Sequence, residues 1–426
     1  MLRVAVVGAG WAGLSAAIEA TTKGHSVTLF EMASHCGGRA RGVDVNGQML
    51  DNGQHIMIGA YAECLRLMTL VGADPSQLWL RTPLAVLQAD GTGLRLGQGH
   101  PIVAFAMAVA MHPTWRWPAK LALALAAMRW GAAGFRCKPS LSVAELTRSL
   151  PQELVRDLID PLCIAALNTP SNEASASVFL RVLRDALFSA AGSADLLLPR
   201  VPLNELLPDP ALVWLEQRRA SLRLSTRVTT IELKPGVWSI DGQDFEHVVI
   251  ATPASEAARL VMPIAPEWAG ITRALRFEPI ITVYLQSAGT RLPAPMLALR
   301  SDAARPAQFV FDRGQLGGPT GLLAFVISGA QPWVDRGIGI AIESTVAQAH
   351  ELIGPLLCGP LTPVQTLTEK RATFRCTPGL RRPPPEIAPG LWAAGDYIDG
   401  PYPATLEGAV RSGSWAAIGA TATHQH

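Results

Sequence analysis

The first thirty residues combine two apolar runs with a helical pattern between them. Residues 4–7 are apolar and partly β-branched, which is typical of a parallel strand buried on both faces. A helix is expected over residues 14–22, ended by Gly24, and a second strand over residues 26–30. This order predicts an α/β domain built around a parallel sheet.

Farther along the chain, the patterns favour strands. Asn46-Gly47 separates alternating runs at 42–45 and 48–51, which is a strong hairpin signal, and residues 60–72 look helical. Further strand-like runs lie at 222–224, 226–231, 237–240, 245–253, 280–285, 308–311 and 322–328. The first four suit a meander that returns to the first domain, and the last three suit an antiparallel sheet in a second domain.

An unusually apolar section occupies the middle of the chain. Residues 91–144 contain no Asp or Glu, and they include apolar runs at 102–111 and 121–128. Neither run reaches the roughly 20 residues that a membrane span needs. Aromatic and basic residues alternate at 115–118, between the two runs. Two interpretations stay open: a monotopic patch that dips into an anionic membrane surface, or an apolar lid over a substrate cavity.

Composition narrows the class of protein. The chain has 426 residues, of which 49% are hydrophobic and 16% charged, so we expect two globular domains and no disorder. A net charge of +2 gives no reason to expect nucleic acid. The six cysteines show no metal-type spacing, which predicts reduced thiols in a cytoplasmic protein and no metal site. No basic and apolar leader precedes the first strand, so a secretory signal is not expected.

The turn after the first strand has the glycine spacing of a dinucleotide site. Gly8 permits the tight turn, Gly10 lets backbone approach a diphosphate, and Gly13 lets the helix pack on the strand. The helix N-terminus faces the negative charge, and Glu31 ends the second strand, where it can accept hydrogen bonds from ribose hydroxyls. Because strand, helix, second strand and acid are all in register, a plain glycine turn is a poor explanation.

The residues after Glu31 favour FAD over NAD. The segment at 35–41, HCGGRAR, resembles the GG motif of the flavin-dependent amine oxidase and phytoene desaturase superfamily. The resemblance implies that Gly37 and Gly38 bring backbone close to the cofactor and that Arg39 helps to hold it. No second glycine fingerprint followed by an acid occurs, so a reductase with two nucleotide sites is not expected.

Two pieces near the C-terminus are similar to those that close the FAD domain in this superfamily. A short strand at 390–394 ends in Gly395-Asp396, and the segment 403–413 opens a helix. The resemblance implies that Asp396 binds the ribityl or diphosphate region and that the helix start near Thr405 faces the flavin pyrimidine edge. No cysteine follows Cys376, so we expect FAD bound without a covalent link.

The resemblance also implies the fold and its division. We expect an FAD-binding, Rossmann-like domain of the glutathione-reductase type, interleaved with an α+β substrate domain that contains an antiparallel sheet. The FAD-binding domain would comprise 1–80, 205–262 and 386–426. The substrate domain would comprise 81–204 and 263–385, with its helical, membrane-contacting part at 102–136.

The segment DNGQHIMIGAY at 51–61 follows the hairpin and should emerge beside the flavin. Gly53 would let backbone approach the ring, and His55 is the candidate catalytic acid, while a purely structural role for this histidine stays open. Asp51 either anchors the end of the hairpin or belongs to the site. The complete set of expected cofactor-binding residues is Gly8, Gly10, Trp11, Ala12, Gly13, Glu31, Gly37, Gly38, Arg39, Ala40, Gly53, Gln54, His55, Ile56, Val228, Gly395, Asp396, Thr405 and Leu406.

More specific motifs resemble the hydroxysqualene dehydroxylase family of bacterial squalene and hopanoid synthesis. They lie at 51–61, 166–170, 179–185, 195–200, 371–374 and 403–410. The resemblance implies reductive loss of an allylic hydroxyl from the C30 isoprenoid hydroxysqualene, giving squalene, with an external electron donor. It also implies a cytoplasmic protein that can be peripheral on the inner face of the membrane.

Two alternatives remain open at this point. One is a carotenoid-type desaturase, which has the same fold and runs the flavin oxidatively. The other belongs to a different class, the Rab GDP-dissociation inhibitors, which share the architecture and bind prenylated partners without FAD. The intact GG motif and the complete Gly395-Asp396 segment argue against this second alternative.

Overall fold

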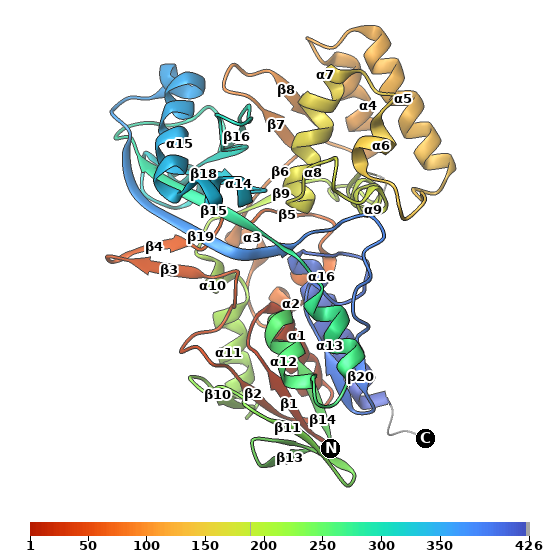
Figure 1. Ribbon diagram of the computed structural model, residues 1–426. Helices are drawn as coiled ribbons and strands as arrows, with labels where there is room; N and C mark the ends of the chain where they lie inside the picture. Colours follow the sequence, from red (N-terminus) through yellow and green to blue (C-terminus); the bar gives the residue numbers. More distant parts are fainter. Residues whose placement is uncertain (188, 423–426) are drawn as a thin grey trace.

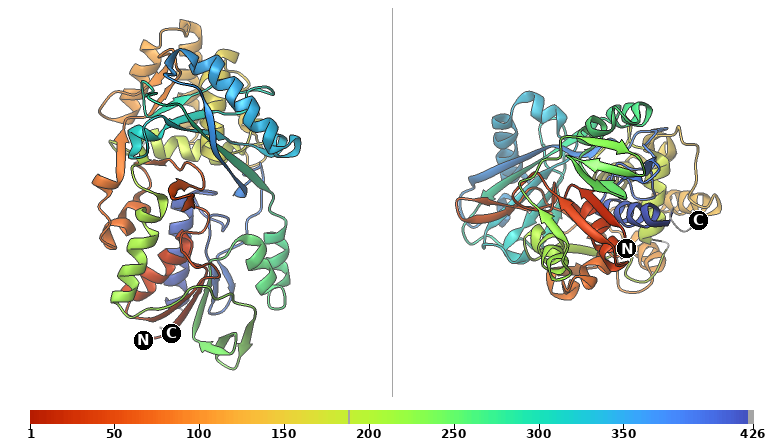
Figure 2. Two further views of the ribbon diagram at one scale, coloured as in Figure 1. Left: turned by 90° about the vertical axis from the view of Figure 1, so that its left-hand side faces the viewer. Right: turned by 90° about the horizontal axis from the view of Figure 1, so that it is seen from below.

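The computed structural model describes residues 1–187 and 189–422 (Figure 1). A mainly parallel sheet lies at the end of the molecule that holds the N-terminus, and an antiparallel sheet and a group of helices lie at the other end (Figures 1 and 2). The chain passes between these two parts several times. The expected combination of an α/β part with an interleaved, antiparallel α+β part is therefore confirmed.

The parallel part is a six-stranded sheet made from distant stretches of sequence. Its spatial order is β10-β2-β1-β14-β21-β20, and neighbouring strands are parallel except β20 and β21. The bounds are Arg3–Val7 for β1, Ser26–Phe30 for β2, Ser221–Arg223 for β10, His247–Ile250 for β14, Glu386–Ala388 for β20 and Leu391–Ala393 for β21. The two central strands are almost wholly buried because both faces of the sheet are covered.

Alternate side chains of β1 point to opposite faces of the six-stranded sheet, and the cores that they enter show which elements cover each face. Val4 and Val6 enter a core shared with α1 (Trp11–Thr22), α11 (Pro208–Gln217) and α16 (Leu406–Ala422). Ala5 and Val7 enter the opposite core, which is shared with a β-meander and two helices. The meander comprises β11 (Ile231–Lys234), β12 (Val237–Ile240) and β13 (Gln243–Phe245), and the helices are α12 (Ala254–Val261) and α13 (Pro266–Arg273).

The second sheet has five antiparallel strands in the order β16-β17-β18-β15-β19. Their bounds are Met296–Ala298 for β16, Phe309–Asp312 for β17, Leu322–Ile327 for β18, Phe277–Gln286 for β15 and Thr362–Phe374 for β19. One face packs on α14 (Gln331–Arg336) and α15 (Ile338–Ile353). The other face packs on a small sheet of β5 (Met57–Ile58), β9 (Leu196–Pro199) and β6 (Trp79–Thr82), which carries part of the 51–61 segment.

Helices make up most of the remaining end of the molecule (Figure 1). They are α4 (Pro101–Met111), α5 (Trp117–Ala132), α6 (Val143–Thr147), α7 (Gln152–Leu154), α8 (Asp160–Leu167) and α9 (Ala176–Leu187). The shorter elements are β3 (Gly42–Val45), β4 (Gln48–Asp51), α2 (Ala62–Leu70), α3 (Pro75–Leu78), β7 (Ala85–Leu87), β8 (Gly93–Arg95) and α10 (Leu203–Leu206). Within the described part of the chain, no helix is both long and apolar enough to cross a membrane.

Most expected elements are present, and three strand predictions are wrong in part. The run at 222–224 is β10, which pairs in parallel with β2 and does not join the meander, and the run at 245–253 is broken at residue 246 and ends at Ile250 in the parallel sheet. The strand–helix–strand start and the Asn46-Gly47 hairpin match the structure. The strand expected over 226–231 begins only at residue 231, because the amides of Thr229 and Thr230 donate to the Asp241 carboxylate instead of to a neighbouring strand. The domain boundaries stay a proposal; the one at residue 262 falls between α12 and α13, whose side chains share one core.

Candidate functional site

The glycine turn between β1 and α1 is held by close backbone packing. Gly8 has a φ of +105°, and its N–H donates to the Phe30 carbonyl at 2.7 Å. A Cβ on Gly8 would lie 2.6 Å from the carbonyl oxygen of Ala251, and a Cβ on Gly13 would lie 1.8 Å from the oxygen of Gly8. These two glycines are therefore required by the protein's own packing.

Gly10 lacks a side chain for a different reason. Its φ of −73° suits any residue, and a Cβ there would meet nothing closer than the Gly38 Cα at 4.0 Å. Gly10 also stands at the start of α1, and no side chain caps the helix there. The uncapped amides and the positive end of the helix dipole suit a diphosphate that approaches the backbone closely. The open space at Gly10 therefore fits the dinucleotide that the sequence predicts.

Glu31 lies directly after β2 and orders the same turn. Its carboxylate accepts hydrogen bonds from the N–H groups of Ala9 at 2.7 Å and Ala33 at 2.8 Å. The backbone carbonyl of Glu31 accepts the Thr226 N–H at 2.8 Å, which brings the irregular 226–230 segment next to the end of β2. Val228 is buried in that segment. Glu31 and Val228, 197 positions apart in sequence, are thus at the same end of the candidate site.

The GG motif lies against the glycine turn. Gly37 and Gly38 have φ values of +102° and +62°, a backbone conformation that favours glycine. The backbone of Gly37 forms a parallel bridge with Gly10. The buried Trp11 indole N–H donates to the Ala40 carbonyl at 3.3 Å and fixes the end of the motif. The expected residues Trp11 and Ala40 therefore stabilise the turn and present no polar side chain to a ligand.

Arg39 joins the N-terminal and C-terminal motifs. One guanidinium nitrogen donates to Asp396 at 2.5 Å, and another donates to the Ala372 carbonyl at 2.8 Å. Burial acts to lower the pKa of Arg39, but the carboxylates of Asp396 and Glu369 outweigh it and raise the pKa above its ordinary value. Arg39 therefore stays charged and fixes Asp396, which lies 357 residues away in sequence.

The start of α16 is built differently from the start of α1. The Thr405 hydroxyl accepts the Gly408 N–H at 3.0 Å and so caps the helix before Leu406. Farther along α16, the Ser412 hydroxyl and the backbone of Gly395 exchange hydrogen bonds of 2.8 and 3.0 Å, which hold the helix against the Gly395-Asp396 turn. The side chain of Thr405 thus serves the helix, and its expected contact with a flavin stays a prediction.

His55 lies close to Arg39 and to the backbone of its own segment. Its Nδ1 lies 2.9 Å from the Gly53 carbonyl, which accepts a hydrogen bond when Nδ1 carries the proton. Burial lowers the pKa of His55; the Gly53 carbonyl opposes this and the charge of Arg39 reinforces it. The neutral imidazole is therefore the resting form near pH 7, with Nε2 as its free nitrogen.

Gln54 and Asp51, which both precede His55, are held by a network that includes residues of the antiparallel sheet. Gln54 donates to the Tyr284 hydroxyl at 2.9 Å and accepts from Arg313 at 3.0 Å. Asp51 is buried, accepts the Leu203 N–H at 3.0 Å, and lies 3.5 Å from Arg313. Burial raises the pKa of Asp51, with Arg313 acting in the opposite direction. Asp51 anchors the end of the hairpin, the first of the two roles considered for it.

The remaining expected residues contribute backbone or apolar contacts. The oxygen of Ala12 lies 2.1 Å from where a Cβ on Gly413 would stand, so α1 and α16 touch at this level. Ile56 packs against the core of the antiparallel sheet. A Cβ on Gly53 would have only the His55 ring near it, at 3.9 Å, so Gly53, like Gly10, is not explained by packing within the chain.

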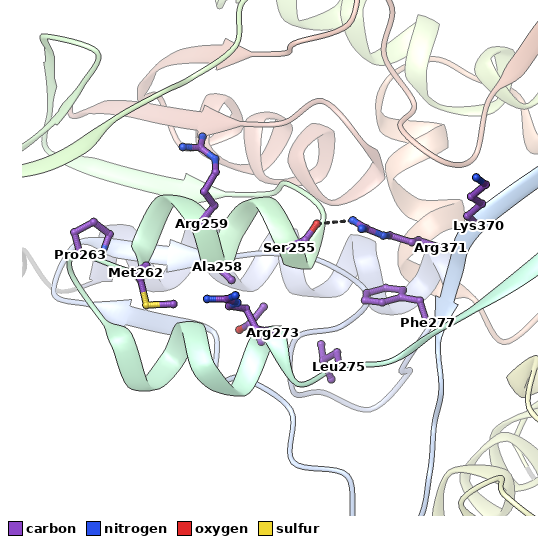
Figure 3. A pocket seen from close by; sticks show the side chains of 11 residues that line it. Ser255, Ala258, Arg259, Met262, Pro263, Arg273, Leu275, Phe277, Lys370 and Arg371 are labelled. Atoms are coloured by element: carbon purple, nitrogen blue, oxygen red, sulfur yellow. Dashed lines mark hydrogen bonds between the residues drawn. The ribbon is translucent and has the colours of Figure 1, made fainter.

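A separate basic pocket opens where α12 and α13 face the end of β19 (Figure 3). Its volume is about 870 Å³, and its lining includes Arg259, Arg273, Lys370 and Arg371. The Arg371 side chain donates to the Ser255 hydroxyl at 2.7 Å, and its carbonyl accepts from Arg39 at 3.2 Å. The pocket therefore borders the Arg39 end of the candidate site, although none of its residues was expected from the sequence.

Several residues that organise the site carry no local sequence signal. Tyr284 and Arg313 reach Gln54 from more than 200 residues away. Glu407 is completely buried and accepts the N–H groups of Glu63 and Cys64 at the start of α2. Asn52 bridges Arg39 and Glu369. Only the folded chain brings these partners together, so spacing along the sequence gives no indication of them.

Comparison with known proteins agrees with this geometry. The sequence pattern of the family described as Flavin containing amine oxidoreductase matches residues 11–418. The chain belongs to this family and is a flavin-dependent oxidoreductase.

Individual relatives are similar over nearly the whole chain. Hydroxysqualene dehydroxylase from Sinorhizobium fredii is 27% identical over 444 residues, covering 97% of each chain. The 15-cis-phytoene desaturase of Capsicum annuum is 24% identical, covering 98% of this chain and 77% of the desaturase. An oxidoreductase from Methanosarcina mazei has the same fold, with a TM-score of 0.73 at 16% identity, covering 98% of this chain and 100% of that one. The resemblance read from the sequence motifs is confirmed.

Proposed function

We propose that the protein binds FAD without a covalent bond and reduces hydroxysqualene to squalene with loss of water. The observation that carries this proposal is the similarity to a hydroxysqualene dehydroxylase over 97% of both chains. The open backbone at Gly10 and Gly53 supports a bound dinucleotide. The expected site residues, the external electron donor and a cytoplasmic location are parts of the same proposal.

The chain's own residues have distinct tasks in this proposal. The turn at Gly8–Gly13 and the start of α1 hold the diphosphate, and Glu31 accepts hydrogen bonds from the ribose. Arg39 keeps Asp396 in place for the ribityl region. Bound reduced flavin supplies the hydride. The hydroxyl needs a proton before it can leave as water, and we assign that proton to Nε2 of His55 in its imidazolium form.

Each turnover consumes one hydride and one proton, which together amount to two electrons and two protons. The allylic C–O bond breaks as His55 protonates the oxygen, water leaves, and a C–H bond forms at the same carbon. Apolar walls, such as Ile56 and the core behind it, keep bulk water from the allylic cation that forms between these events. Because burial lowers the pKa of His55, its imidazolium is a stronger acid than free imidazolium.

The decisive experiment is anaerobic incubation of the purified protein with hydroxysqualene and reduced FAD, followed by identification of the product. Squalene is the expected product. The similarity to phytoene desaturase supports a second candidate, oxidative desaturation, which would instead give new double bonds in phytoene or squalene. Protein that releases no flavin on denaturation and converts neither substrate would contradict both reactions and favour a prenyl-binding role.

A further inference from the structure

The helices α4 and α5 expose large apolar side chains in regular rows. On α4, Val103, Met107 and Met111 follow one another at intervals of four, and each is more than half exposed. On α5, Leu121 and Leu125 continue the pattern with Trp117 at the helix start, and they are also more than half exposed. Helices of a water-soluble surface normally show polar residues on such rows.

These rows are the outward sides of helices that are otherwise well packed. Ala104 and Val109 of α4 and Ala119 and Leu123 of α5 are buried in the same core. The corner between the two helices is fixed by His112, which stacks on Trp115 with ring centroids 3.8 Å apart. The exposed apolar residues are therefore not the result of loose helices.

The concentration of apolar surface is specific to this region. Among the described residues, eighteen large hydrophobic side chains are exposed, and eight of them lie on α4 and α5. These helices lie at the end of the molecule opposite the six-stranded sheet (Figures 1 and 2). An apolar patch of this kind on a folded protein marks an interaction surface.

The charges around the patch indicate what it meets. No acidic residue occurs from 91 to 144, while Arg116, Arg129 and Lys138 are exposed there. Lys120 lies over the Trp117 ring at 5.1 Å, which places a cation beside an exposed aromatic side chain. Apolar rows whose charged residues within 91–144 are all basic are complementary to a lipid layer with anionic headgroups.

We infer that the α4–α5 surface, defined by residues 101–132, docks in the plane of an anionic lipid layer. The apolar rows enter the acyl boundary, and the basic side chains contact the headgroups. Behind this surface, α9 packs with α4 in the same core, and Asp185 of α9 hydrogen-bonds Tyr402 just before α16. Helix α9 thus links the lipid-facing surface to the segment that precedes α16. The inference stands whether or not the proposed reaction is right.

Flotation with vesicles free of isoprenoid tests the inference in the full-length protein. Wild type is expected to float with vesicles of phosphatidylcholine and phosphatidylglycerol in equal parts, and about tenfold less with phosphatidylcholine alone. The double variant Leu121→Glu/Leu125→Glu should lose at least tenfold in bound fraction on the anionic vesicles. The matched control is Val213→Glu/Leu233→Glu, which changes two side chains that are 54% and 66% exposed outside the surface, and it should bind like wild type.

Three results would overturn the inference. They are failure of wild type to float, equal loss in the control, and unchanged binding of the Leu121→Glu/Leu125→Glu variant. A dimer in solution that this variant converts to monomer would assign the surface to a second copy of the chain instead.

Circular dichroism verifies that both double variants are folded. If the Leu121→Glu/Leu125→Glu variant is not folded, Arg116→Gln/Arg129→Gln replaces it. Its binding to the anionic vesicles is expected to be lower than that of wild type and to depend less on salt concentration.

Discussion

The helices α1 and α16 pack side by side, but they begin in different ways. Ser15 of α1 donates to the Val410 carbonyl of α16 at 2.8 Å, so the two are in direct contact. The start of α1 is a glycine with no capping side chain, whereas the start of α16 is capped by Thr405. A helix start that its own chain satisfies is structural, and one that is left open has amides available for a ligand.

The largest expected effect is on stability, and it comes from the packing of α1 against the glycine turn. Gly13→Ala puts a Cβ 1.8 Å from the Gly8 oxygen, which belongs to the backbone and cannot rotate away as a side chain would. We expect a loss of about 3 kcal/mol or more in the free energy of unfolding, the upper range for overpacking. Thermal unfolding followed by circular dichroism measures it. A normal unfolding temperature would show that the turn can relax and that Gly13 is not needed for packing.

The next effect tests the open helix start directly. Gly10→Asp supplies α1 with a cap at a residue whose φ and ψ of −73° and 179° suit it. The apoprotein should unfold at the same temperature as wild type or higher, while flavin affinity falls at least 100-fold, because the carboxylate occupies and repels the diphosphate site. Flavin absorbance after gel filtration reports the affinity. If the variant still binds flavin with the affinity of wild type, the diphosphate does not bind at the start of α1.

A third change leaves both helix starts intact and alters only the proposed proton donor. His55→Asn should lower turnover by about 100-fold with flavin still bound, which is the lower range for loss of a general acid. In wild type, turnover should rise as pH falls from 8 to 6, because the pKa of His55 is lowered and imidazolium forms only in acid. The variant should lose this pH dependence. Turnover near that of wild type would leave His55 a structural role.

The smallest effect belongs to the capped helix. Thr405→Val removes the hydroxyl that accepts the Gly408 N–H, and we expect a loss of about 1 kcal/mol in unfolding free energy. Flavin affinity should change much less than in Gly10→Asp. Chemical denaturation with flavin release as a second signal measures both. A flavin loss as large as that of Gly10→Asp would show that the two helix starts serve the cofactor equally.

Local signals in the sequence were sufficient for the strand–helix–strand start of the chain and for most other strands. Gly8, Gly13 and the residue after β2 have roles fixed by a strand–helix–strand unit of about thirty residues, so their spacing alone is informative. The strand expected at 226–231 was wrong except at residue 231, because a side chain, Asp241, accepts the amides of Thr229 and Thr230 that a neighbouring strand would have used. Propensity does not register such competition.

The contacts within the candidate site could be predicted from the sequence to a much smaller extent than the strands. The motifs indicated that Arg39, His55 and Asp396 belong to one site, but not that Arg39 binds Asp396, nor that burial, reinforced by the charge of Arg39, lowers the pKa of His55. The partners of Gln54 come from β15 and from the turn after β17, which no spacing rule connects to residue 54.

The sequence by itself determined the turn, the helix start and the acid-free apolar section, because these depend on residues that are neighbours in the chain. Only the tertiary structure decided which side of α4 and α5 remains uncovered and which distant groups meet at Arg39 and Gln54. Hydrogen bonds and burial at these places are set by segments hundreds of residues apart, and their energies exist only when the chain has folded.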